Sequence, residues 1–343
     1  MPPVLVAPDK FKGTFTAPEV AAAIGRGLER AGLEPPDLCP VADGGDGTMA
    51  ALLTRMGGET RGLEVLDPLG RPVRAGFALL EDGGTAVVEL AEASGLRLLA
   101  PEERDPLRTT TRGTGQLIVA AIAEGAEVVL VGAGGSATVD GGRGAIEAIR
   151  EAGGTRGARL VVLCDVRTPW EQAAEVFGPQ KGATPEGVRE LAARLDRLAG
   201  ELPRDPRGMP MGGAAGGFSG GMWAAFDATL EPGAPFLLEA VDFDERARGA
   251  RAVVVGEGQL DVTTLQGKAA GEAAGRARAA GVPCHAIVGS NAIGLDEARA
   301  LGLEDVLEAT TLAELEAAGE TLGRRLGASE VAPGGEMGKA GPS

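Results

Sequence analysis

The sequence predicts an α/β protein of two domains, a discontinuous doubly wound (Rossmann-like) parallel-sheet domain and an inserted α/β domain with a mixed sheet. Short apolar runs alternate with helical patterns towards both ends of the chain, which is typical of parallel strands joined by crossover helices. Residues 59–93 instead hold apolar runs separated only by turns, which indicates an antiparallel meander. The length of 343 residues also exceeds the usual size of one domain.

The expected domain boundaries follow from where these two patterns change. We expect residues 1–60 and 245–327 to form the discontinuous domain, residues 61–244 to form the inserted domain, and a cleft to separate them. Residues 328–343 are expected to be a disordered tail. Short buried strands are expected in the discontinuous domain at 4–7, 38–42, 252–255, 284–288 and 306–309, and in the inserted domain at 128–131 and 160–164.

Helix starts and one long loop complete this outline. Thr16, followed by Glu19 three residues later, predicts a capping box at the start of a helix that reaches Arg30. Thr184 is expected to cap a helix that extends to Ala199. The proline- and glycine-rich segment 203–217 is expected to be a mobile or ligand-wrapping loop, or a plain linker between domains.

Composition excludes several classes of function. A formal net charge of −16 argues against a nucleic acid or an anionic membrane as partner. The chain has no apolar run of 18 residues and no signal-peptide pattern at its start, so a cytoplasmic protein is expected. The lone histidine, His285, lies in an apolar run and there is no tyrosine, which disfavours a Ser-His-Asp hydrolase and a histidine metal cluster. The three cysteines lack paired spacing and are expected to be buried thiols: Cys39, Cys164 and Cys284.

The stretch 127–144, EVVLVGAGGSATVDGGRG, carries the strongest binding signal. A buried-strand run leads into glycines and then into an expected helix, and glycine amides with a helix N-terminus together form a cradle for an anion such as phosphate. Two other interpretations remain open: a tight structural turn, and a dinucleotide fingerprint, for which the acidic residue expected about 20 positions on is missing. The candidate binding residues of this stretch are Gly134, Gly135, Ser136, Thr138 and Asp140.

Acidic and hydroxyl-bearing loops follow other expected strands. Carboxylates among glycines at 43–48 suit Mg²⁺ or a substrate hydroxyl, although aspartate-glycine pairs are also common in turns that have only a structural role. The segment 109–116 offers hydroxyls and a guanidinium to an anion at the start of a helix. The candidate residues from these and the remaining loops are Asp9, Asp43, Gly44, Gly45, Asp46, Thr111, Arg112, Asp165, Gly256, Glu257, Gly258, Asp261 and Thr264.

The distribution of lysine adds a further indication. Only five of the 33 basic residues are lysines, and four of them lie in glycine-bearing loops although arginine is otherwise preferred. An ammonium is a compact, mobile charge that suits a phosphoryl group in transfer. The four lysines are Lys10, Lys12, Lys181 and Lys268.

Taken together, these loops resemble the bacterial class I glycerate kinases. The resemblance rests on APDKFKGT, ADGGDGT, TTTRGTGQLI, GGSATVDGG, CDV, VFGPQKGA, GAAGG and VVGEGQLDVTTLQGK, which run in the family's order from Ala7 to Lys268. It implies a kinase that uses ATP and Mg²⁺ to phosphorylate D-glycerate at its 2-hydroxyl, giving 2-phosphoglycerate. The chain departs from the family pattern in abbreviated segments at 153–159 and 167–172, and in Asp46, where glutamate is frequent.

The roles that we expect for the candidate residues follow from this resemblance. Catalytic roles fall to Asp165, Asp43 and the four lysines, and Mg²⁺ would be held among Asp165, Asp261 and Glu257. Phosphoryl transfer needs a carboxylate near the attacking hydroxyl and cations on the phosphate oxygens. The alternatives are an NAD(P)-dependent hydroxy-acid oxidoreductase and a non-catalytic small-ligand binding protein.

Overall fold

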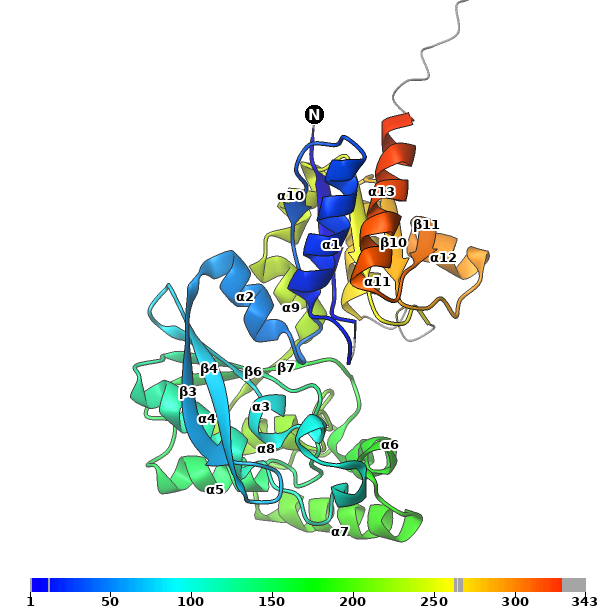
Figure 1. Ribbon diagram of the computed structural model, residues 1–343. Coiled ribbons are helices and arrows are strands. Elements are labelled where there is room, and N and C mark those ends of the chain that lie inside the picture. Colours follow the sequence, from blue (N-terminus) through cyan, green and yellow to red (C-terminus); the bar gives the residue numbers. More distant parts are fainter. Residues whose placement is uncertain (1, 12, 262–263, 265–267, 329–343) are drawn as a thin grey trace, which may run out of the picture. The chain divides into compact units, whose positions relative to one another are not determined.

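The computed structural model describes residues 2–11, 13–261, 264 and 268–328 (Figure 1). Its contacts divide the chain into two compact units. The first consists of Met1–Pro40, Glu245–Val262 and Ala274–Ser343, and the second of Val41–Asp244 and Thr263–Ala273. Lys12 and the expected tail beyond residue 328 lie outside the described residues. Among the residues that the structure does describe, none of the helices has the length and apolar character needed to cross a membrane.

The first unit is built on a five-stranded, wholly parallel sheet in the order β11-β10-β9-β1-β2, which confirms the expected doubly wound sheet. Its first strand is buried along its whole length, as the apolar run of the sequence predicts. Its strands are β1 (Val4–Pro8), β2 (Asp37–Leu38), β9 (Ala252–Gly256), β10 (Cys284–Val288) and β11 (Leu303–Glu308). Its helices include α1 (Ala17–Arg30), α12 (Leu295–Leu301) and α13 (Leu312–Ala328), while α10 (Phe243–Arg248) and α11 (Ala269–Ala279) each cross the boundary between the units.

Helices α1 and α13 lie side by side in the first unit (Figure 1). The capping box expected at the start of α1 is present, because the Thr16 hydroxyl accepts from the Glu19 amide and the Glu19 carboxylate accepts from the Thr16 amide. A Cβ built on Gly27 would lie 2.0 Å from the carbonyl oxygen of Glu316, so glycine is required for the close approach of the two helices.

The second unit contains a six-stranded mixed sheet in the order β3-β4-β5-β6-β7-β8. Strands β3 to β5 form the expected antiparallel meander, and β5 then pairs in parallel with β6, so the meander continues directly into a parallel half-sheet. This arrangement confirms the expected mixed sheet. The strands are β3 (Gly58–Leu66), β4 (Pro72–Leu80), β5 (Thr85–Glu89), β6 (Val128–Gly132), β7 (Arg159–Cys164) and β8 (Thr229–Pro232).

Alternate residues of the central strands bury opposite faces of this sheet. Val129 and Val131 pack with residues of α4, α5 and α8, whereas Leu130 packs with residues of α2 and α9. Strand β6 is therefore covered on both faces, as a parallel strand requires. The helices of this unit are α2 (Thr48–Met56), α3 (Ala91–Ser94), α4 (Arg112–Ala123), α5 (Arg143–Glu151), α6 (Ala173–Phe177), α7 (Pro185–Glu201), α8 (Phe218–Phe226) and α9 (Gly233–Ala240).

Two details differ from the outline drawn from the sequence. Residues 41–60, which we assigned to the discontinuous domain, group with the second unit. The segment 203–217 is not a linker between units, because it packs within the second unit: the Gly213 amide donates to the Thr168 carbonyl (2.9 Å) and the Gly216 carbonyl accepts from the Gly141 amide (3.1 Å). Local composition could not predict how these two segments group, because the grouping depends on contacts with segments that are distant in the sequence.

The cysteines and the histidine behave as expected. All three thiols are buried and free. His285 is also buried, with its Nδ1 atom 3.2 Å from Asp305 Oδ2, and burial lowers the pKa of its imidazole. The prediction of a hydrogen-bonded core histidine is confirmed.

Candidate functional site

Four parallel strands of the second unit end at one edge of its sheet, and the loop 43–47 rests on that edge. Gly132 is the last residue of β6, and a Cβ added to it would lie 3.0 Å from the Gly44 carbonyl oxygen. Gly44 in turn lies against Gly233, where a Cβ on Gly44 would be 2.9 Å from the Gly233 Cα. Ligands of α/β proteins bind at the carboxyl ends of parallel strands, so this edge is the natural candidate site.

The two glycine-rich loops at this edge touch backbone to backbone. A Cβ on Gly134 would lie 2.5 Å from the Cα of Gly45, so no side chain fits between the loops. Gly135 has φ +73°, and a Cβ there would lie 3.0 Å from Asp46 Oδ1. That Asp46 oxygen is buried and has no hydrogen-bond partner among the described residues. The loops therefore expose the backbone of Gly135 and hold beside it one buried carboxylate oxygen without a hydrogen-bond partner among the described residues.

Lys181 lies beneath the same glycine loop. Its side chain is buried, and its Nζ atom donates to Ser136 Oγ and to the Thr138 carbonyl oxygen, both at 2.7 Å. Burial lowers the pKa of Lys181 to about 7, against the opposing influence of the nearby charges of Asp140 and Asp165. The structure thus brings together Lys181, Ser136, Thr138 and the exposed Asp165, which follows β7.

Asp140 has a structural role that the sequence did not indicate. Its carboxylate accepts from the Thr111 amide and hydroxyl and from the amides of Gly142 and Gly144. Burial raises the pKa of this carboxyl group. The first amides of α5 are therefore occupied by Asp140, and the expectation that this helix N-terminus cradles an anion is wrong for these amides. Asp140 and Thr111 instead tie the glycine loop to the start of α4.

Glu89 is a residue of this edge that the sequence analysis missed. It is the last residue of β5, only 6% exposed, and its Oε1 atom accepts from the amides of Gly47 (2.9 Å) and Met49 (2.8 Å). Burial, together with the neighbouring charge of Asp46, raises its pKa to about 7. Glu89 thereby caps α2 and holds the loop 43–47. A glutamate that ends a fully apolar strand is the signal that could have identified it.

A similar edge exists in the first unit. The Asp9 amide donates to the Gly256 carbonyl (2.8 Å), which joins the ends of β1 and β9, and Lys10 Nζ lies 3.7 Å from Asp9 Oδ1. Asp9 and Glu257 are both less than a tenth exposed. The Glu257 carbonyl accepts from the Gly289 amide at the end of β10, and Gly258 follows it in the same loop. Two carboxylates and a lysine therefore gather at the carboxyl ends of these strands.

Other predicted residues lie elsewhere. Arg112 points to the surface of the second unit, where it pairs with Glu151 of α5. Thr264, which is buried, and Lys268 both group with the second unit, whereas Asp261 groups with the first. The three expected Mg²⁺ ligands are thus divided between the two units. Among the described residues, no three His, Cys, Asp or Glu side chains are close enough to form a metal site by themselves.

Glycine loops, a buried lysine and carboxylates at the carboxyl ends of parallel strands define an α/β enzyme of the phosphotransferase class. The comparison with known protein families agrees with this class. The model of the glycerate kinase family matches residues 4–153 and 150–326. The chain belongs to the glycerate kinase family.

Individual relatives support the same assignment. A glycerate kinase of Bacillus subtilis is 40% identical over 327 residues, which cover 84% of this chain and 85% of the relative. A glycerate 2-kinase of Escherichia coli is 35% identical, with 77% of this chain and 79% of the relative covered. The crystal structure of a putative glycerate kinase 2 from Salmonella typhimurium LT2 has a TM-score of 0.82 and 32% identity, and covers 95% of this chain and 98% of that one. The resemblance drawn from the loops and the predicted fold class are both confirmed.

Proposed function

We propose that the chain transfers the γ-phosphoryl group of ATP to the 2-hydroxyl of D-glycerate, giving 2-phosphoglycerate and ADP. The observation that carries the proposal is the buried Lys181, held at 2.7 Å from both Ser136 Oγ and the Thr138 carbonyl, directly under the glycine loop and beside Asp165. The names of the relatives, glycerate kinase and glycerate 2-kinase, support the choice of substrate and hydroxyl. The expected location of the reaction in a cleft between domains stays a prediction from the sequence.

Phosphoryl transfer depends mainly on positioning and on the neutralisation of charge. In the proposed mechanism the backbone of Gly134 and Gly135 approaches the phosphates closely, because no side chain separates it from the ligand. The Lys181 ammonium stabilises the negative charge of the transferring group. A pKa of about 7 without ligand is compatible with this role, since a phosphate dianion nearby favours the charged form.

Asp165 is proposed either to accept the proton of the glycerate hydroxyl or to bind Mg²⁺. Asp43 is the other candidate for each of these two roles. Mg²⁺ is usually held by one or two carboxylates together with phosphate oxygens, so a site without a cluster of three acidic residues fits it. The unpartnered buried oxygen of Asp46 is a second suitable donor on this edge. When bound, the ion would neutralise charge on the phosphate oxygens.

Asp9, Lys10 and Glu257, which the strand ends of the first unit bring together, keep the roles in binding ATP or glycerate that the sequence predicts for them. The roles assigned to the other predicted residues remain predictions: Lys12, Lys268, Gly256, Gly258, Asp261 and Thr264. D-glycerate and ATP as the partners, the absence of nucleic-acid and membrane partners, and a cytoplasmic location are likewise predictions from the sequence.

One assay tests the proposed reaction. The protein is incubated with ATP, Mg²⁺ and D-glycerate, and the products are followed by ADP release and by ³¹P NMR, which separates 2-phosphoglycerate from 3-phosphoglycerate. ADP that appears only with glycerate, together with 2-phosphoglycerate, is expected. ATP binding without turnover would point instead to a binding protein, and reduction of added NAD(P)⁺ at the expense of a hydroxy acid would point to an oxidoreductase.

Substitution of the carboxylate tests its role. Asp165→Asn should lower kcat by at least about 100-fold while the folded state is retained, since the side chain is exposed and the amide keeps its shape. Asp196→Asn is the matched control, because it makes the same change at an exposed position on α7 that pairs with the surface residue Arg207. Near-normal turnover in Asp165→Asn would remove this residue from the mechanism.

A further inference from the structure

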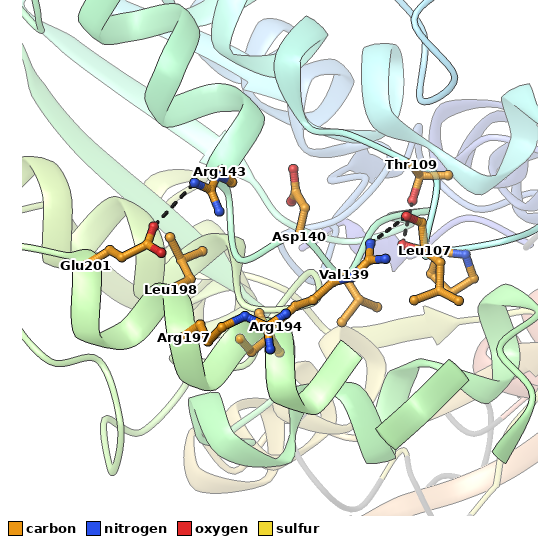
Figure 2. Close-up of a pocket in the computed structure, with 11 residues that line it drawn as sticks. Leu107, Thr109, Val139, Asp140, Arg143, Arg194, Arg197, Leu198 and Glu201 are labelled. Atoms are coloured by element: carbon orange, nitrogen blue, oxygen red, sulfur yellow. Dashed lines mark hydrogen bonds and ion pairs between the residues drawn. The ribbon is translucent and has the colours of Figure 1, made fainter. Parts of the chain in front are cut away.

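A pocket lies in the second unit, and of the site residues described above only Asp140 lines it. Its volume is about 330 Å³, which is within the range of small-molecule sites. Figure 2 shows it between α7 and the segments 106–109 and 139–143. Neither Lys181 nor any of residues 134–136 lines it. Its lining includes Leu107, Val139, Arg143, Arg194, Leu195 and Arg197.

Three arginines surround this pocket, and two of them are positioned as a pair. Arg194 and Arg197 stand three residues apart on α7, so their side chains emerge on the same face of the helix, where like charges repel. Figure 2 shows both side chains at the pocket, with the Arg194 guanidinium group directed towards Leu107. Arg197 makes no hydrogen bond or ion pair with any other residue described in the structure. An anion between them would relieve the repulsion.

The remaining contacts of these arginines leave capacity for a ligand. Arg194 donates to the Leu107 carbonyl (2.8 Å) and to Glu190, and a guanidinium carries five N–H donors, more than these contacts use. Arg143 is the least available of the three, because it already pairs with Glu147 (3.2 Å) and Glu201 (3.3 Å).

Asp140, an acidic residue of the lining, does not neutralise the positive charge of Arg194 and Arg197. The Asp140 carboxylate accepts four hydrogen bonds from Thr111, Gly142 and Gly144, and Figure 2 shows it directed away from Arg194 and Arg197. Its charge is therefore satisfied within the protein. Glu201, which also lines the pocket, pairs with Arg143, and Glu190 pairs with Arg194, so Arg197 is the arginine that faces the pocket without an acidic partner among the described residues.

Apart from Thr109 and Glu201, the rest of the lining is apolar. Val139, Leu195 and Leu198 are almost fully buried and form a wall beside the arginines, and Pro106 and Leu107 extend it. Guanidinium forks match the geometry of phosphate oxygens, while an apolar wall favours a short carbon skeleton. We propose that this pocket binds a small phosphomonoester, with the phosphate held by Arg194 and Arg197 and the carbon skeleton against Val139, Leu195 and Leu198.

Calorimetric titration with glycerol 3-phosphate tests the proposal on the full chain, without any need for turnover. Saturable binding is expected, and it should be weaker at high salt because the arginines are exposed. Arg197→Gln removes no contact within the protein and should weaken binding about tenfold, as expected for one charge-assisted hydrogen bond. The double variant Arg194→Gln/Arg197→Gln should weaken it further.

Two control variants separate this pocket from the candidate active site. Arg189→Gln makes the same change on α7 outside the lining, and Ser136→Ala removes the hydroxyl that Lys181 contacts; both should keep the affinity of the wild type. The proposal is overturned if glycerol 3-phosphate shows no saturable binding up to about 10 mM, or if Arg197→Gln binds as tightly as the wild type. Loss of binding in Ser136→Ala, or equal affinity for inorganic phosphate, would also overturn it. The outcome does not depend on whether glycerate is the substrate.

Discussion

Replacing Glu89 by glutamine should change how the stability of the second unit depends on pH. In the wild type this carboxyl group is buried at the end of β5, and burial raises its pKa from 4.5 to about 7. The folded state therefore holds the proton more tightly than the unfolded state. The stabilisation that results is fully present below pH 4.5 and is lost as the pH rises through 7. Glutamine resembles the protonated form at every pH, so Glu89→Gln should lose this dependence.

The size of the effect follows from the shift. A displacement from 4.5 to about 7 corresponds to about 3 kcal/mol of folding free energy, at about 1.4 kcal/mol for each pKa unit. About 2 kcal/mol of this falls between pH 5.5 and 8, the range that avoids the isoelectric point near 4.7. The free energy of unfolding of Glu89→Gln, relative to that of the wild type, should therefore rise by about 2 kcal/mol from pH 5.5 to 8.

Urea unfolding followed by tryptophan fluorescence measures this quantity. Both tryptophans of the chain, Trp170 and Trp223, lie in the second unit together with Glu89, so their emission reports on the relevant part of the protein. Glu64→Gln, at an exposed position of β3, controls for the loss of one negative charge.

Parallel pH profiles of the free energy of unfolding for Glu89→Gln and the wild type would refute the role of Glu89 in this pH dependence. The same relative rise of the free energy of unfolding in Glu64→Gln would also refute it. A third variant, Glu89→Ala, separates charge from capping: it leaves the amides of Gly47 and Met49 without their acceptor and should destabilise the unit by about 1–3 kcal/mol at every pH.

Three further predictions concern the glycine loop and its supports. Lys181→Met should lower glycerate-dependent ADP release by about 10²–10³-fold, because one buried cation is lost from the transition state; a loss below tenfold would contradict its role. Gly134→Ala should destabilise the second unit by about 2 kcal/mol in the same urea assay, since its Cβ would lie 2.5 Å from the facing backbone, whereas Gly84→Ala, which meets nothing within 4 Å, should be nearly neutral. Thr111→Val removes the hydroxyl bonded to Asp140 and should cost about 1–3 kcal/mol, with an unchanged unfolding midpoint counting against this link.

Much of the fold could be predicted because its signals are local. The buried runs at β1, β6 and β10 are short stretches of β-branched and apolar residues, and the capping box at Thr16 needs only the side chain three residues on. Elements without such signals were missed. The short strand β8 has only half-buried residues and ends in proline, and helix α12 begins after a glycine without a side-chain cap.

The candidate site was predictable only in part. The loops around Asp9, Gly134 and Asp165 do lie at the carboxyl ends of parallel strands, as residues that closely follow β1, β6 and β7 must. The loop at Asp43 reaches the edge of the second sheet although β2 already ends at Leu38, which the sequence could not show. Which side chains face a ligand could not be predicted. Arg112 follows a threonine- and glycine-rich stretch like an anion-binding residue, yet it pairs with Glu151 on the surface, because the helix turns its side chain towards α5.

The sequence by itself determined the order and kind of the elements, the positions of the glycine loops and the family, because each depends on residues that are close together in the chain. Only the tertiary structure decided what the polar side chains do. Burial shifts the pKa values of Lys181 and Glu89. Four hydrogen-bond donors from two segments of the chain bind the Asp140 carboxylate. One turn of α7 brings Arg194 and Arg197 to the same pocket. Desolvation and hydrogen bonding depend on neighbours that are remote in sequence, and only the folded chain brings those neighbours together.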